Sequence, residues 1–143
     1  MKTIFYQIKS IPVVLYGEPS EKGYLFIHGQ DGNKEEAAAF AEIAVPAGNQ
    51  VIGIDLPQHG ERKAMESGFD PWTAVPALQA VLAERKLYWN NISLRANSIG
   101  AYFSMLAFQH SPINKALLVS PIVDMERLIL DMMRWACVTE ESL

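Results

Sequence analysis

Short apolar runs rich in β-branched residues alternate with segments of helical composition, and this alternation constrains the fold more than any other feature of the sequence. The apolar runs cover residues 24–27, 50–56, 91–97 and 115–120. Helical patterns cover residues 33–44, 70–86 and 99–110. Strands that alternate with helices pair in parallel and carry helices on both faces. The sequence therefore predicts an α/β fold, a three-layer α/β/α sandwich around a mostly parallel sheet.

Local signals refine this outline. Residues 3–9 and 11–17 are rich in β-branched and aromatic residues and predict an antiparallel hairpin ahead of the parallel strands. Asp70 and Pro71 form a helix start, with a capping side chain followed by proline at the first helical position. Pro76 should kink or restart that helix, because proline lacks the N–H that the helix needs.

The composition limits which binding partners and which cellular compartment suit this protein. The 143 residues suit a single domain over residues 1–143, and the formal charge of −4 argues against nucleic acid or an anionic membrane as a partner. One cysteine, Cys137, allows no internal disulfide. The N-terminal residues do not resemble a signal peptide, and no apolar run reaches the ~18 residues of a membrane span. We therefore predict a cytoplasmic protein.

The strongest chemical signal surrounds Ser98. This serine lies between a predicted strand and a predicted helix, with Ala96 two residues before it and Gly100 two residues after it. A nucleophile elbow needs small residues at those positions, because the tight turn brings them against neighbouring backbone. The usual pattern has glycine at the first position, so Ala96 is a mild departure. On this segment alone, a plain helix N-cap explains Ser98 equally well.

Two further segments resemble the α/β-hydrolase family. His28 and Gly29 follow a buried strand, and residues 55–60 form a D-x-P-x-H-G element after the next strand. With the Ser98 segment they occur in the order that this family has, across nearly the whole chain. The resemblance implies an oxyanion hole made by the backbone N–H groups of Gln30 and Ile99, with His28 and Gly29 beside the substrate pocket. It implies a serine hydrolase of the carboxylesterase kind, acting on a small ester or thioester through a Ser98 acyl-enzyme.

A Rossmann-like nucleotide-binding domain is the rival interpretation of the glycine segment. A Gly-rich turn between strand and helix can hold phosphates, and Asp55 at the end of the next strand could bind a ribose. Gly29 and Gly32 do not complete G-x-G-x-x-G, and a leading hairpin does not suit that fold. The hydrolase interpretation is therefore preferred.

The rest of a catalytic triad is missing from the sequence. His110 lies twelve residues after Ser98 on one predicted helix, about 18 Å away, and so cannot be the base. His59 is the remaining candidate base, and Asp124 is a candidate acid whose context is that of a helix cap. The family places its acid and histidine after later strands. We therefore expect a hydrolase fold truncated after about six strands and inactive as this chain, or else a non-catalytic scaffold remnant.

The C-terminal residues suggest a contact with substrate, and the last strand suggests a contact with a second copy of the chain. Residues 124–143 should begin a helix with one apolar face, and the resemblance implies a cap or connecting helix there. Met132, Met133 or Trp135 would then line an acyl pocket; the alternative is that each is a core or interface residue. The apolar strand at 116–119 should form an unpaired sheet edge, so we expect a homo-oligomer through that edge or through the terminal helix. No metal or organic cofactor is implied, because the sequence has no cluster of His, Cys and carboxylate ligands.

Overall fold

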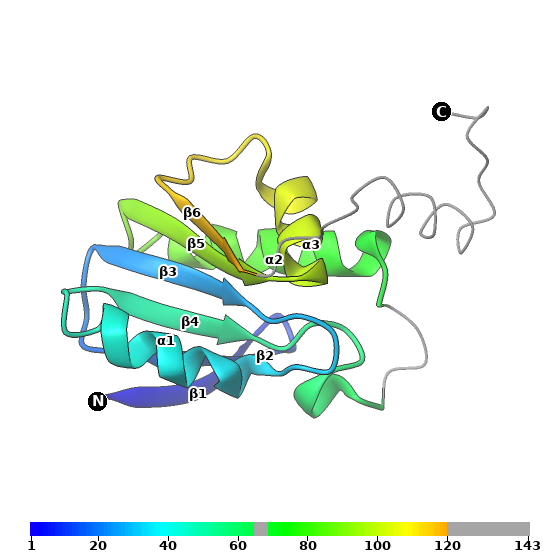
Figure 1. Ribbon diagram of the computed structural model, residues 1–143, viewed down its shortest axis with the longest axis horizontal. Helices are drawn as coiled ribbons and strands as arrows, with labels where there is room; N and C mark the ends of the chain where they lie inside the picture. The colour runs from blue at the N-terminus through cyan, green and yellow to red at the C-terminus, as the bar shows by residue number, and fades with distance from the viewer. Residues whose placement is uncertain (65–68, 120–143) are drawn as a thin grey trace.

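A computed structural model of the chain describes residues 1–64 and 69–119, and these contain one six-stranded sheet in the order β1-β2-β4-β3-β5-β6 (Figure 1). The strands are β1 (Thr3–Ile8), β2 (Ile11–Tyr16), β3 (Lys22–Ile27), β4 (Gln50–Ile54), β5 (Asn91–Asn97) and β6 (Ala116–Val119). The β1–β2 and β2–β4 pairs are antiparallel, and the other three pairs are parallel. The predicted hairpin and mostly parallel sheet are confirmed.

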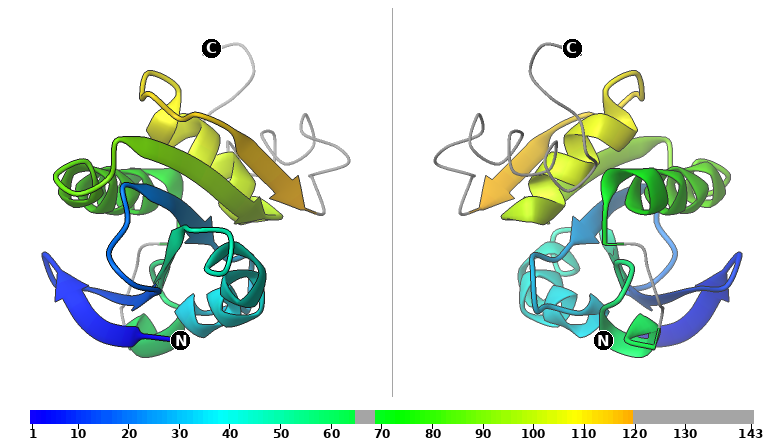
Figure 2. Two further views of the ribbon diagram at one scale, coloured as in Figure 1. Left: turned by 90° about the vertical axis from the view of Figure 1, so that its left-hand side faces the viewer. Right: turned by 90° about the vertical axis from the view of Figure 1, so that its right-hand side faces the viewer.

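Helices cover both faces of the sheet, which makes the predicted three layers (Figure 2). The helices are the short 3₁₀ segments η1 (Lys34–Glu36) and η2 (Gly60–Arg62), and the α-helices α1 (Ala37–Ala44), α2 (Pro71–Arg85) and α3 (Ile99–Phe108). Helix α1 lies on one face, and α2 and α3 pack together on the other. Since β3, β4 and β5 run in parallel, their carboxyl ends meet at one edge of the sheet.

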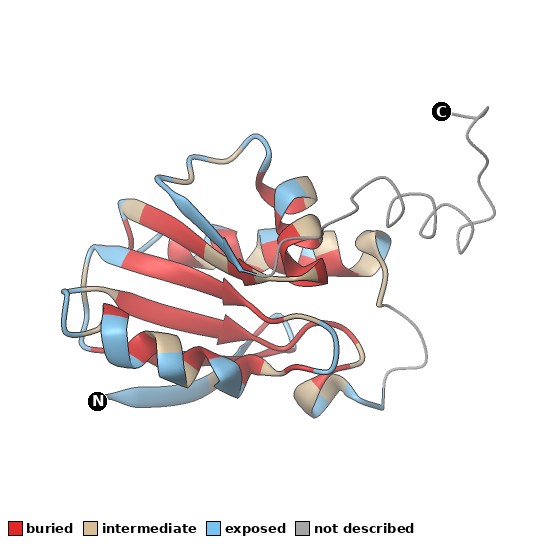
Figure 3. Cartoon of the chain, viewed as in Figure 1, coloured by how far each residue is buried: buried red, intermediate tan, exposed pale blue. Residues whose placement is uncertain are grey.

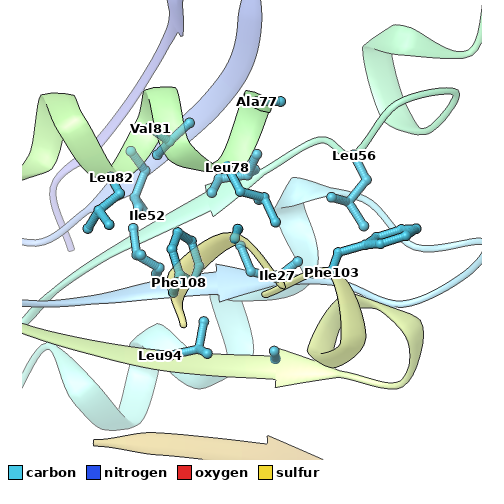
Figure 4. Close-up of a cluster of buried hydrophobic side chains, with 14 of the residues drawn as sticks. Ile27, Ile52, Leu56, Ala77, Leu78, Val81, Leu82, Leu94, Phe103 and Phe108 are labelled. Atoms are coloured by element: carbon cyan, nitrogen blue, oxygen red, sulfur yellow. The ribbon is translucent and has the colours of Figure 1, made fainter. Parts of the chain in front are cut away.

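Strand alternation divides the hydrophobic core into two clusters. Leu25 and Ile27 of β3 face α2 and α3, whereas Tyr24 and Phe26 face α1. The larger cluster, between the sheet and the α2–α3 pair, is shown in Figure 4. Strands β2 and β4 are buried along their whole length, as expected of strands with a helix layer on each side (Figure 3).

The predicted helix starts are present, but the predicted restart of the helix at Pro76 is wrong. The Asp70 side chain accepts the N–H of Thr73 at 2.9 Å, and the Asn33 side chain accepts the N–H of Glu35 at 3.0 Å. Helix α2 continues through Pro76 from Pro71 to Arg85. Its inward residues on both sides of the proline, Ala74 and Leu78 among them, are fully buried. This packing stabilises the helix despite the missing N–H.

Strand β6 lies at the edge of the sheet, and all four of its residues are exposed. Leu117, Leu118 and Val119 are 44%, 40% and 38% exposed. The predicted helix over residues 124–143 lies outside the described residues. Within the ranges that are described, no helix is both long enough and apolar enough to cross a membrane.

Candidate active site

Ser98 occupies the sharp turn between β5 and α3, at the carboxyl edge of the sheet. Its backbone has φ 51° and ψ −124°, a left-handed conformation that residues with a side chain rarely adopt. The Ser98 N–H donates to the carbonyl oxygen of Val119 at 3.1 Å, and the Ser98 carbonyl accepts the N–H of Ala101 at 3.0 Å. The side chain makes no capping hydrogen bond to the helix that follows it. This geometry differs from that of a side-chain N-cap and forms a strained turn between strand and helix.

Small residues surround the turn as the elbow spacing requires. A Cβ atom on Gly100 would overlap the carbonyl oxygen of His28, so α3 can approach the end of β3 only with glycine here. A Cβ atom on Gly29 would lie 3.1 Å from the Cβ atom of Ser98. Ala96 is completely buried without conflict. The mild departure from glycine at position 96 therefore fits the fold.

Gln30 lies in a tight turn that passes beside Ser98. The turn is closed by the Gly32 N–H, which donates to the Gly29 carbonyl at 3.1 Å, and Asp31 within it has φ 65°. Among the described residues, neither the Gln30 N–H nor the Ile99 N–H has a protein acceptor. Ile99 is the first residue of α3, so its N–H belongs to the unpaired first turn of a helix.

The His28 side chain supports this turn from inside the protein. It is completely buried, its Nε2 atom accepts the N–H of Leu56 at 3.0 Å, and its Nδ1 atom lies 2.6 Å from the Gly29 carbonyl oxygen. Burial lowers the pKa of His28, so the ring stays neutral. Both ring nitrogens are engaged, and His28 is not among the residues that line the cavity described below.

His59, in the loop after β4, also has a hydrogen-bond partner at each of its ring nitrogens. Its Nε2 atom accepts the N–H of Asp31 at 3.0 Å, and its Nδ1 atom lies 2.9 Å from the Pro57 carbonyl oxygen. The ring packs 4.4 Å from the ring of Phe69, centroid to centroid, and only 9% of the residue is exposed. A base must offer a free nitrogen to the serine hydroxyl, and His59 has none in this arrangement.

A buried ion pair joins the same two loops, and sequence reasoning did not single it out. Lys34 is 2% exposed and Asp55 is 0% exposed, with Nζ 3.1 Å from Oδ2. The Lys34 ammonium also contacts the carboxylates of Glu35 and Glu61, at 2.9 and 2.6 Å. Burial alone would lower the pKa of Lys34, but hydrogen bonds to its carboxylate partners outweigh burial and raise it. The loop after β3 is thereby fixed to the loop after β4.

A cavity of about 450 Å³ opens beside the Gln30 turn. It is lined by Gln30, Asp31, Gly32, Gln58, His59, Gly60, Lys63 and Phe69. Phe69 gives the cavity one apolar aromatic side chain, and the rest of the lining is mostly polar or charged. The predicted pocket residues Met132, Met133 and Trp135, and the candidate acid Asp124, lie outside the described residues.

The structure separates the remaining histidine from the site. His110 is exposed beyond the end of α3, whereas Ser98 precedes its first turn. Within residues 1–64 and 69–119, no group of three or more His, Cys, Asp or Glu side chains is placed to hold a metal ion.

The fold matches solved hydrolases. An esterase from Pyrococcus furiosus superposes with a TM-score of 0.72 at 16% identity, over 98% of this chain and 56% of the esterase. An epoxide hydrolase from Vigna radiata gives a TM-score of 0.71 at 20% identity, over 94% and 43%. An esterase from Exiguobacterium antarcticum gives 0.66 at 19% identity, over 86% and 46%. No protein-family profile and no curated protein sequence matches the chain.

These matches show the fold of the chain. The chain has the α/β-hydrolase fold, as the motifs around His28, Asp55 and Ser98 predict. It spans about half the length of the solved structures it matches.

Proposed function

We propose that this chain carries the nucleophile and the oxyanion hole of a serine hydrolase, of the carboxylesterase kind, that cleaves a small ester or thioester. The observation that carries the proposal is the strained backbone of Ser98, held at φ 51° at the first turn of α3 beside the Gln30 turn. Strain at a serine between strand and helix is the mark of a nucleophile elbow. Two of the similar solved structures are esterases, which agrees with the proposal.

In the proposed reaction, the Ser98 hydroxyl oxygen attacks the substrate carbonyl and its proton passes to a general base. The carbonyl oxygen becomes an oxyanion, which the N–H groups of Gln30 and Ile99 stabilise. A donor of this kind contributes about 3–4 kcal/mol to the transition state by precedent. Loss of the alcohol or thiol leaves an acyl-serine, which water then hydrolyses. The cavity beside Gln30 would receive part of the substrate.

We place the base and the triad acid outside this sequence. His28 and His59 have both ring nitrogens engaged, and His110 lies at the far end of α3. The isolated chain should therefore be close to inactive. We propose the cytoplasm as its compartment, because a sequence with the single cysteine Cys137 suits a reducing environment.

The two rival functions make different demands on the site. A nucleotide phosphate at the glycine turn would approach the Glu36 carboxylate, since a Cβ on Gly32 would overlap that group. Like charges at this point disfavour the nucleotide-binding interpretation. A non-catalytic scaffold role uses the same fold, so only the reactivity of Ser98 separates it from a hydrolase.

A fluorophosphonate probe followed by intact-mass measurement tests the proposal. The 143-residue protein would be incubated with the probe with and without added imidazole, which substitutes for a missing base. We expect slow labelling alone, faster labelling with imidazole, and one adduct that maps to Ser98. Ser98→Ala should abolish the adduct, and Ser111→Ala is the matched control that should leave it.

Other outcomes identify the alternatives. Rapid labelling without imidazole would mean that a base is present in the chain, which contradicts the assignment of the base to a residue outside it. No adduct at Ser98 under either condition would favour the scaffold function. Thermal stabilisation by NAD or ATP would favour the nucleotide-binding function.

A further inference from the structure

The direction of the Gln30 N–H depends on two histidines that hold the peptide units on either side of it. We propose that His59 is a positioning residue: by accepting the N–H of Asp31, its Nε2 atom fixes the orientation of Gln30 and aims the Gln30 N–H toward the oxyanion. This inference rests on the proposed function, because it gives His59 a role in the same oxyanion hole. It replaces the role of catalytic base that the sequence allowed for His59.

The hydrogen bonds of His59 select a single protonation state. A backbone N–H can only donate, so the bond from Asp31 requires a bare lone pair on Nε2. A carbonyl oxygen can only accept, so the contact with Pro57 requires a proton on Nδ1. Both partners therefore specify the neutral ring with its proton on Nδ1. His28 has the same tautomer, imposed by the N–H of Leu56 and the carbonyl of Gly29.

Peptide geometry carries this constraint to Gln30. In a trans peptide the C=O and the N–H point in opposite directions. The Gly29 carbonyl points at the His28 ring and at the Gly32 N–H, so the Gln30 N–H of the same peptide unit points away from them. The next peptide unit is held by its Asp31 N–H on His59. Without His59, only the His28 side of Gln30 would remain fixed.

The surroundings of His59 keep the ring in place. Its ring centroid lies 4.4 Å from that of Phe69 and 5.1 Å from that of His28, and Phe69 packs edge-on against Phe103 of α3 at 5.5 Å. The His59 ring is both packed and hydrogen-bonded, so it is already fixed before substrate binds. It can therefore hold Asp31 without losing much side-chain entropy in each turnover. The contacts reach from the loop after β4, through Phe69, to the helix that begins beside Ser98.

Two substitutions at one position separate the hydrogen bond from the packing. His59→Gln places an amide oxygen near the Nε2 position and keeps an acceptor for Asp31, whereas His59→Phe keeps a ring and removes the acceptor. In His59→Phe, amide hydrogen exchange at Asp31 should accelerate by roughly tenfold, the factor expected for one lost hydrogen bond. The Gln30 amide resonance should shift as well. His59→Gln should restore both, and His110→Gln, at an exposed histidine away from the site, is the matched control.

The same variants test the link to Ser98. With imidazole present, fluorophosphonate labelling should slow by roughly tenfold in His59→Phe, which is less than the 10²–10³ expected for a fully lost donor. Labelling should recover in His59→Gln. A Gln30 resonance and a labelling rate that are both unchanged in His59→Phe would overturn the proposal.

One measurement on the wild-type protein remains decisive if His59→Phe fails to fold. A nitrogen–nitrogen coupling across the hydrogen bond should join the Asp31 amide to Nε2 of His59, and the proton should reside on Nδ1. A proton found on Nε2 would overturn the proposal. If the wild-type Ser98 is not labelled at all, the proposed hydrolase function fails, and the exchange and coupling data still decide whether His59 orients the turn.

Discussion

Lys34 and Asp55 form an ion pair that is almost completely shielded from solvent, with Nζ 3.1 Å from Oδ2. Asp55 Oδ1 also accepts the backbone N–H of Lys34 at 2.8 Å. Removing one partner of a buried pair leaves the other charge without compensation. Lys34→Met should therefore lower the free energy of unfolding by about 3–5 kcal/mol. Urea unfolding followed by circular dichroism measures this loss.

Glu61→Gln is the matched comparison for that prediction. The Glu61 carboxylate also contacts the Lys34 ammonium, at 2.6 Å, but its side chain is 63% exposed. Exposed ion pairs are weak because water screens them, so this change should cost less than about 1 kcal/mol. Equal losses in the two variants would contradict the view that the buried Lys34–Asp55 contact dominates the network.

The buried ring of His28 should make stability depend on pH. Burial lowers its pKa in the folded protein, so between that pKa and the ordinary value of about 6.5 the unfolded chain binds more protons. The free energy of unfolding should therefore fall as the pH drops below about 6.5 and be flat just above neutrality. Urea midpoints from pH 8 to pH 5 measure the slope. His28→Gln should flatten it, and an equal slope in that variant would assign the effect to other groups.

Gly100 should be far less tolerant of change than Ala96. A Cβ atom at position 100 would overlap the His28 carbonyl oxygen, so Gly100→Ala should destabilise the protein by about 1–3 kcal/mol through overpacking. Ala96→Gly completes the usual elbow pattern and should cost about 0.5–1 kcal/mol, because glycine is more flexible in the unfolded chain. Thermal unfolding of the two variants compares these costs. A neutral Gly100→Ala would contradict this order and would mean that α3 can move away from β3.

We expect the chain to self-associate through β6. Among the described residues this strand pairs with β5 alone, and Leu117, Leu118 and Val119 are all more than a third exposed. A lysine on an edge strand opposes edge-to-edge pairing, so Leu117→Lys should shift the protein toward monomer. Ile43→Lys, at an exposed apolar residue of α1, is the control and should have no such effect. Light scattering over a dilution series measures the mass, and a wild-type monomer throughout would refute the expectation.

The sequence predicted the fold well because its strongest signals are local. Strand β5 covers the same residues, 91–97, that the apolar run indicated, and the Asp70 cap and the Ser98 turn lie where short-range rules place them. Pro76 was the exception. The local rule predicts a kink or a restart, and the restart is absent, because burial of the inward face of α2 on both sides of the proline outweighs the missing hydrogen bond.

The supporting contacts of the site could not be predicted, because they join residues far apart in the sequence. A lysine in the first turn of a helix is usually a surface residue, so the sequence does not indicate that Lys34 is buried. Its ion pair with Asp55 explains the burial. The role of His59 likewise depends on Asp31, 28 residues away. A motif can indicate that His59 is near the site. Only the loop geometry shows that its basic nitrogen is occupied.

The backbone strain at Ser98, the proposed nucleophile, should lower the free energy of unfolding. At φ 51° and ψ −124° a side chain costs about 1–3 kcal/mol, whereas glycine adopts such a conformation freely. Glycine also loses more chain entropy on folding, by about 0.5–1 kcal/mol. The balance predicts that Ser98→Gly is more stable than Ser98→Ala by about 1 kcal/mol.

Urea unfolding of these two variants provides a clean comparison, because neither has the hydroxyl group and neither should be labelled by the fluorophosphonate probe. Their difference therefore reports the backbone alone. If Ser98→Gly proves less stable than Ser98→Ala, the turn is not strained in solution. If it is more stable, the fold maintains an unfavourable backbone at Ser98, at the carboxyl edge of the sheet, and such strain is retained where a site requires a fixed geometry.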